Sequence, residues 1–380
     1  MLGIDPIYNY FEDERVIFLN EFHNISLIKY YSFLPKKWKL LIAIFCKIEG
    51  IFSKFDFIGG KIRAKVVALS VKISYKIKLG DVLRGFSPDV LITDHNRGND
   101  VQSFVKYTRK NGCISFALPH SASNFTNRLR ILNWKKFTDT PSKESVDKLF
   151  DCVIFPNKHD PNYNITPEKK VILGSARFSK SWVLEKERLF KSKKYFFPKD
   201  KDNTKVLFLI PKRQNNIFWE ELIRSIEIIE TYDLSVVFKL PVRGKHSLPK
   251  RFLNSPKIDI SDDPTSVLVD WADVVFYIDT TVIFEALVKD KTVVHLKHLH
   301  INSTSSDDIP GICRSHTRDD FVKLLDSFEK DSDFRPYDLK NTVKILEEVI
   351  YPTGREEPIE DYENYINNFS LEKNDESPVI

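Results

Sequence analysis

The amino-acid sequence predicts an α/β protein made of two doubly wound domains. Short apolar runs rich in Val, Ile and Phe alternate with segments of helical periodicity along most of the 380 residues. This alternation is typical of parallel sheets joined by crossover helices. A chain of this length has room for two domains of ordinary size. Its shares of hydrophobic (42%) and charged (29%) residues are those of a globular protein.

The N-terminal half carries the first series of elements. Apolar, β-branched runs predict its strands, and apolar residues at helical spacing predict its helices. We expect strands at 16–22, 89–94, 113–119 and 152–157, and helices over 36–54, 61–84 and 99–111. These elements define an expected N-terminal domain over residues 1–165.

The second half repeats the alternation more regularly. A helix follows almost every predicted strand, which is the order of a doubly wound sheet. We expect strands at 170–174, 205–211, 234–241, 257–261, 273–279 and 292–296, and helices over 179–192, 217–231, 264–271, 280–289, 317–329 and 338–350. The expected C-terminal domain spans 166–350, and residues 351–380 are expected to form a terminal helix and a frayed tail.

Sequence features that would indicate several other classes of protein are missing. The four cysteines show no CxxC or similar ligand spacing, so neither a zinc site nor a disulfide framework is expected. No run reaches the ~18–20 apolar residues that span a bilayer, and no secretory pattern opens the chain, so we expect a cytoplasmic protein. The absence of GxxxxGK[ST], GxGxxG and GxSxG motifs argues against P-loop, standard dinucleotide and hydrolase sites.

The region 36–84 is strongly basic, with twelve Lys or Arg residues against three acidic ones. Within it, Trp38, Leu41, Ile42, Phe45 and Phe52 recur at helical spacing with lysines between them. Two interpretations are open: a helix that contacts an anionic membrane at its inner face, and a core helix with a solvated basic face. A nucleic-acid partner is not expected, because no recognisable binding module accompanies the charge.

The segment ADVVFYIDTTVIFEALVKDKTVV carries the most functional information. A buried strand ends at Asp279, Thr280 and Thr281 open the next helix, and Glu285 follows one turn later. Hydroxyls and free backbone N–H groups at such a place favour a phosphate, and the carboxylate is suited to ribose hydroxyls. An ordinary N-cap followed by a helical glutamate is the alternative interpretation.

This segment resembles the one in GT-B glycosyltransferases, CDP-glycerol glycerophosphotransferases and nonhydrolysing sugar-nucleotide epimerases, in which a strand ends in Ser-Ser or Thr-Ser before a Glu-Ala helix. The resemblance covers residues 205–300. It implies the GT-B fold, in which two Rossmann-like domains face an interdomain cleft, and nucleotide binding through Thr280, Thr281 and Glu285. It implies no cofactor besides a nucleotide-sugar donor, which acts as co-substrate.

Three groups of basic residues follow predicted strands. Lys212 and Arg213 come directly after one strand, and Lys239 and Arg243 flank the end of another. Cations at these places would neutralise donor phosphates and stabilise the departing nucleotide, although solvated turns are an equal alternative. Arg177 follows KVILG, where similar GT-B enzymes hold donor phosphates with a Gly-x-x-Arg element; a structural salt bridge is the alternative.

Two residues of the first half are candidates for a general base. Asp94 and His120 come from the ends of neighbouring predicted strands, where an acceptor hydroxyl would lie. The segment ALPHSASN around His120 resembles the "HG" element of related transferases, whose histidine is implicated in catalysis. A strand-end histidine bonded to the backbone is the alternative interpretation.

A metal site is not expected. His295, His298 and His300 are close in sequence, but their spacing at a strand end does not place three imidazoles on one face. No Asp-x-Asp pair follows an apolar strand, as a metal-dependent transferase of the other common architecture would need. The catalytic reaction is therefore expected to be metal-independent.

These observations favour a glycosyltransferase that moves a sugar from a nucleotide-activated donor to a glycan or lipid-linked acceptor. The expected setting is the synthesis of bacterial surface polysaccharide such as capsule or O-antigen. One alternative is a sugar-nucleotide epimerase of the same fold. Another is a non-enzymatic module that binds anionic lipid or nucleic acid through 36–84, which would show strongly salt-dependent binding.

Overall fold

The computed structural model describes residues 2–3, 28–29, 89–94, 99–119, 150–158, 169–191, 203–212, 217–241, 248–300 and 312–375. The chain forms two compact units, Met1–Asp89 with Gly98–Cys113, and Val90–Arg97 with Ile114–Ile380.

In the first unit, β1 (Leu2–Gly3) pairs with β2 (Ile28–Lys29) in parallel, and α5 (Asn99–Lys110) confirms the helix expected over 99–111. The strand expected at 16–22 and the helices expected over 36–54 and 61–84 lie outside the described residues. The interpretations of the basic region 36–84 therefore stay predictions.

A four-stranded parallel sheet opens the second unit. Its strands are β3 (Val90–Asp94), β4 (Ile114–Leu118), β5 (Cys152–Phe155) and β6 (Lys170–Ile172), in that spatial order. The strands expected at 89–94, 113–119 and 152–157 are thereby confirmed. Strand β6 pairs with β5 through Val153↔Lys170, so it belongs to this sheet, whereas we expected it to begin the second series.

A six-stranded parallel sheet follows in the same unit. It consists of β7 (Lys205–Leu209), β8 (Ser235–Lys239), β9 (Ile258–Ser261), β10 (Val274–Tyr277), β11 (Thr292–His295) and β12 (Cys313–Arg314). The spatial order is β12-β11-β10-β7-β8-β9. From β9 to β12 this is the 3-2-1-4-5-6 order of doubly wound sheets, which confirms the α/β class with parallel sheets. The order reverses between β7 and β10.

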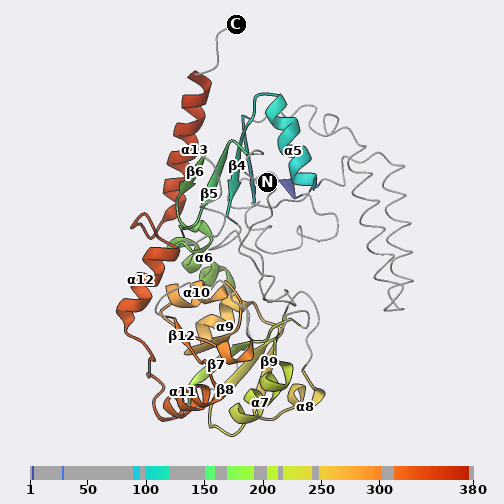
Figure 1. Ribbon diagram of the computed structural model, residues 1–380, viewed down its shortest axis with the longest axis vertical. Coiled ribbons are helices and arrows are strands. Elements are labelled where there is room, and N and C mark those ends of the chain that lie inside the picture. Colours follow the sequence, from blue (N-terminus) through green and yellow to red (C-terminus); the bar gives the residue numbers. More distant parts are fainter. Residues whose placement is uncertain are drawn as a thin grey trace, which may run out of the picture. The chain divides into compact units, whose positions relative to one another are not determined.

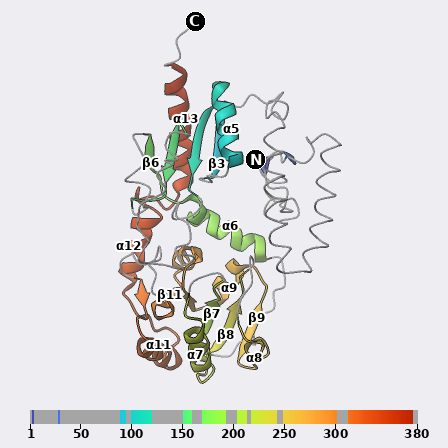
Figure 2. The ribbon, with the colours of Figure 1, turned by 45° about the vertical axis from the view of Figure 1, so that its right-hand side comes forward.

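Helices cover both faces of the six-stranded sheet (Figures 1 and 2). One face carries α7 (Trp219–Ile229), α8 (Lys250–Leu253) and α11 (Arg318–Lys330); the other carries α9 (Thr265–Trp271), α10 (Val282–Val288) and α12 (Leu339–Val349). Successive side chains of a strand alternate between the two faces. Thus Phe276 packs edge-on against Phe208 and Phe321 on one face, whereas Tyr277 packs on the other.

The C-terminal helix α13 (Pro358–Asp375) packs on the four-stranded sheet, beside β6 and β5 in Figure 1. Its Phe369 ring lies 5.3 Å from that of Phe116, edge to face, and the Tyr362 hydroxyl donates to Gly174 O at 2.7 Å. The expected terminal helix is thus confirmed, and its apolar face is buried against the sheet.

Hydrogen bonds join the segment that follows β6 to the segment that follows α12. After β6, η7 (Ala176–Phe178) leads into α6 (Lys180–Lys191). The Ser175 N–H donates to Ile350 O at 3.0 Å, and the Tyr351 hydroxyl donates to Phe178 O at 3.0 Å. The segment that follows β6 and the one that follows α12 are thus fixed against each other.

Candidate functional site

The carboxyl ends of β7 and β10 mark the expected ligand edge of the six-stranded sheet. These strands are neighbours, with Phe208 opposite Phe276, and the chain leaves them toward opposite faces, to α7 and α10. Ligands of open α/β sheets bind outside the carboxyl ends at such a reversal of strand order. Lys212 lies just beyond β7, and Asp279 lies just beyond β10. The fold therefore brings these sequence-predicted residues to adjacent strand ends.

Thr280 and Thr281 connect β10 to α10. Thr280 Oγ1 accepts from Val282 N at 3.3 Å, and Thr281 is the N-cap residue but makes no side-chain cap hydrogen bond. Both residues are partly exposed. The Thr281 hydroxyl is therefore not used to cap the helix, and a ligand oxygen at this edge can approach it.

Lys239 is the last residue of β8, next to β7 on the same edge. Lys239 is only 6% exposed, and its Nζ donates a long hydrogen bond to Ser261 O at 3.4 Å. Burial lowers the pKa of Lys239, and the charges of Asp262 and Asp263 oppose this shift. Among the described residues this buried ammonium has one long hydrogen bond, so it retains donors for an anionic ligand.

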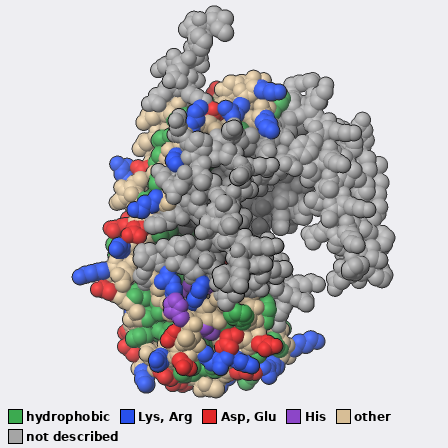
Figure 3. Space-filling model, in the orientation of Figure 1, with side chains coloured by type: hydrophobic (Ala, Val, Ile, Leu, Met, Phe, Trp, Pro, Cys, Tyr) green, Lys and Arg blue, Asp and Glu red, His purple; other side chains and the backbone are tan. Residues whose placement is uncertain are grey.

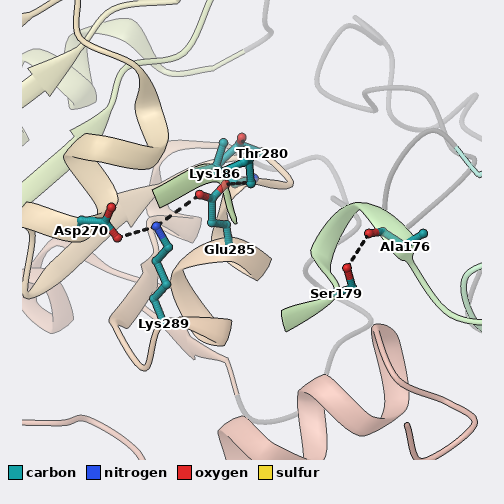
Figure 4. Close-up of polar contacts among 8 residues, drawn as sticks. Ala176, Ser179, Lys186, Asp270, Thr280, Glu285 and Lys289 are labelled. Atoms are coloured by element: carbon teal, nitrogen blue, oxygen red, sulfur yellow. Dashed lines mark hydrogen bonds and ion pairs between the residues drawn. The ribbon is translucent and has the colours of Figure 1, made fainter. Parts of the chain in front are cut away.

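Glu285 lies in a cluster of four charged side chains, shown in Figure 4. Its Oε2 is 2.7 Å from Lys186 Nζ, and its Oε1 is 3.6 Å from Lys289 Nζ. Lys289 also forms an ion pair with Asp270. We call Lys186, Asp270, Glu285 and Lys289 the buried charge cluster, because only the Asp270 side chain exceeds about one-tenth exposure, at 31%. It joins α6, α9 and α10.

Electrostatics within this cluster keep Glu285 ionised. Burial alone would raise the pKa of Glu285, but the charge of Lys186 and its hydrogen bond lower it overall. The pKa of Lys186 is also lowered, chiefly by burial, although Glu285 acts in the opposite direction. The charge of Arg177 contributes to this lowering.

Sequence reasoning missed Lys186 as part of this site. A helix was expected over 179–192, but no residue within it was proposed for the site. One signal was present: Lys186 is three residues after Val183, which is 1% exposed, and residues three apart share a helix face. A lysine within an apolar stripe needs a buried counter-ion.

The remaining predicted residues are only partly described. Asp94 ends β3 and is paired in register with Leu118 of β4, but its side chain is not among the described ones. His120, Arg213 and Arg243 lie outside the described residues. Their roles stay predictions.

The three histidines after β11 do not converge. His298 Nε2 lies 3.0 Å from Ser225 Oγ, and its Nδ1 lies 2.9 Å from Ser315 Oγ. Nδ1 also lies 3.3 Å from Ser315 O, so each ring nitrogen has a hydrogen-bond partner, whichever of the two carries the proton. Burial lowers the pKa of His298, which favours the neutral form. Both ring nitrogens are thus occupied.

His295 and His300 are buried, with their Nε2 atoms 3.1 Å apart. Within the described ranges, no group of three or more His, Cys, Asp or Glu side chains could hold a metal ion. A depression of about 420 Å³ lies beside His298 and is lined by Phe218, Glu220, Glu221, Arg224, His298 and Arg318. Figure 3 shows histidine side chains beside Lys and Arg side chains on the visible face.

Comparison with protein-family models finds none that matches, and no curated protein matches the sequence. Among solved structures, the chain is similar to the UDP-GlcNAc 2-epimerase from Neisseria meningitidis bound to UDP-GlcNAc, at 16% identity, covering 70% of this chain and 77% of that chain, with a TM-score of 0.48. It is similar to the wall teichoic acid polymerase TagF at 10% identity, covering 76% and 74%, with a TM-score of 0.45.

A third similar structure is the calicheamicin glycosyltransferase CalG4, at 12% identity, covering 85% of this chain and 83% of that chain, with a TM-score of 0.43. The resemblance described from the sequence also includes epimerases and glycosyltransferases. Across the described ranges, no helix is both long and apolar enough to span a bilayer.

Proposed function

We propose that this chain is a GT-B glycosyltransferase that transfers a sugar from a nucleotide-activated donor to a glycan or lipid-linked acceptor in surface-polysaccharide synthesis. The observation that supports it most is the reversal of strand order between β7 and β10. Lys212 follows one of these strands, and Thr280 and Thr281 follow the other. This is the edge at which doubly wound sheets bind nucleotides.

In the proposed mechanism, cations replace a metal at the donor's phosphates. Lys212 and Lys239 neutralise the phosphates, together with Arg177, Arg213 and Arg243. Negative charge grows on the leaving nucleotide in the transition state, so fixed cations and the hydroxyls of Thr280 and Thr281 lower the barrier there. Asp279 lies in this loop, where a carboxylate accepts hydrogen bonds from ribose hydroxyls. Glu285 is only 6% exposed and is paired with Lys186, so Asp279 is the carboxylate that we propose for the ribose.

A nucleotide screen by thermal shift tests the donor site. We expect one of UDP, GDP, CDP or CMP to raise the melting temperature, because a ligand that binds only the native state at about 100 times its Kd stabilises it by about 2.7 kcal/mol. Lys212→Ala and Thr281→Val should reduce the shift. Lys257→Ala is the matched control, because exposed Lys257 precedes β9 and so lies at the opposite, amino edge. If no nucleotide raises the melting temperature, the donor site is wrong.

The acceptor base is tested separately. We propose that Asp94 or His120 takes the proton from the acceptor hydroxyl, because Asp94 ends β3 and His120 comes two residues after β4, the neighbouring strand. The donor for this assay is a sugar linked to the nucleotide that raises the melting temperature in the screen. With this donor, Asp94→Ala or His120→Ala should lower the transfer rate about 10²- to 10⁴-fold. Normal rates in both variants would contradict this assignment. Conversion of the nucleotide sugar without any acceptor would indicate an epimerase instead.

A further inference from the structure

The buried charge cluster places a carboxylate close to the proposed donor site. Glu285 is one turn beyond Thr281 on α10 and is only 6% exposed. A charge in such a dry place acts over a longer range than a solvated one. On its own, ionised Glu285 would repel a phosphate held at the loop between β10 and α10.

Lys186 compensates this negative charge. Its ammonium is 2.7 Å from Glu285 Oε2, so the two charges form a tight pair (Figure 4). Lys289 is further away, at 3.6 Å, and is shared with Asp270. The second pair is neutral within itself, so Lys186 is the cation that balances Glu285. It comes from α6, 99 residues earlier in the chain.

We propose that Lys186 is a positioning residue of the donor site: it neutralises Glu285 and holds its carboxylate, so that the loop after β10 accepts a phosphate-bearing ligand. This inference rests on the proposed function. It does not require Lys186 to touch the donor. It predicts that removal of the Lys186 charge weakens the binding of a more negatively charged ligand more than that of a less charged one.

The test compares two ligands that differ in charge. The nucleoside diphosphate with the largest thermal shift and its monophosphate are titrated calorimetrically into the full-length wild type, Lys186→Met, Glu285→Gln and the double variant. We expect Lys186→Met to weaken the diphosphate about tenfold or more and the monophosphate by less. The double variant removes both charges, so the ratio of the two affinities should return to that of the wild type.

This ratio separates an electrostatic role from a purely structural one. A loss of packing would weaken both ligands by the same factor and leave the ratio unchanged. The double variant retains no unpaired charge from this pair and is expected to fold even if Lys186→Met does not. Lys180→Met is the matched control, because Lys180 is also on α6 but pairs with the exposed Glu356.

Two outcomes would overturn the proposal. An unchanged ratio in Lys186→Met, or a lowered ratio that stays lowered in the double variant, contradicts the role of Lys186 while leaving the donor site intact. A wild type that binds neither ligand contradicts the proposed function, and the role of Lys186 with it.

Discussion

Replacing Glu285 by glutamine is expected to lower the free energy of unfolding by about 3–5 kcal/mol, because removal of one partner leaves a buried charge uncompensated. The side chain of Lys186 is 11% exposed and that of Lys289 is 8% exposed, so water cannot take over the role of the carboxylate. Lys289 keeps Asp270 as a partner, whereas Lys186 loses its only carboxylate among the described residues. Urea unfolding followed by circular dichroism measures the change.

An exposed ion pair provides the control for this substitution. Lys180 and Glu356 are 2.9 Å apart, but their side chains are 53% and 61% exposed. Solvent screens such a pair, so Glu356→Gln is expected to change stability little. Equal losses in Glu285→Gln and Glu356→Gln would show that burial of the cluster does not determine its contribution.

The contribution of Glu285 should depend on pH in a defined direction. Because its pKa is lowered in the folded protein, its stabilisation is fully present above the ordinary carboxyl pKa. It is lost as the pH falls through the lowered value. The stability difference between wild type and Glu285→Gln should therefore be constant near neutral pH and shrink under acid conditions. A difference that grows on acidification would contradict the lowered pKa.

Local patterns sufficed for the order of elements but not for sheet membership. The run VVFY of β10 has all four residues buried, and such continuous apolar runs are typical of strands covered on both faces. Strand β6 has only three residues, all partly exposed, and its sequence does not encode its partner. Tertiary packing determines that this strand pairs with β5, so the sequence pattern predicted the wrong sheet for it.

The same limit explains which parts of the candidate site were predicted. Thr280, Thr281 and Asp279 could be proposed because they follow a strand directly, and strand ends can be located from sequence. The partner of Glu285 could not be found this way, because Lys186 is 99 residues away. Likewise, His298 contacts Ser225 at a separation of 73 residues. Long-range polar pairs depend on packing, which a local pattern does not contain.

Replacing Gly174 by alanine is expected to lower the free energy of unfolding by roughly 2–5 kcal/mol. This is the sum of the strain of a left-handed backbone and that of an overpacked contact. Gly174 has φ of +85°, and a Cβ there would lie 2.5 Å from Ile350 O. This oxygen belongs to the backbone and accepts from the Ser175 N–H, so it cannot move away without loss of that bond. The Tyr362 hydroxyl also donates to Gly174 O, so docking of α13 should weaken as well. Hydrogen exchange of α13 measures this directly.

Two other glycines separate backbone strain from the close contact. Gly112 and Gly354 have φ of +81° and +77°, but no described atom lies within 4 Å of a Cβ at either position. Their alanine variants should therefore show only the left-handed strain of about 1–2 kcal/mol, with unchanged exchange in α13. If Gly174→Ala is no more destabilising than these two, the segments after β6 and α12 are not held in the close contact seen here. In that case the backbone oxygen of Ile350 can move away from the added methyl group without loss of stability, and α13 is fixed to the four-stranded sheet by its apolar face alone.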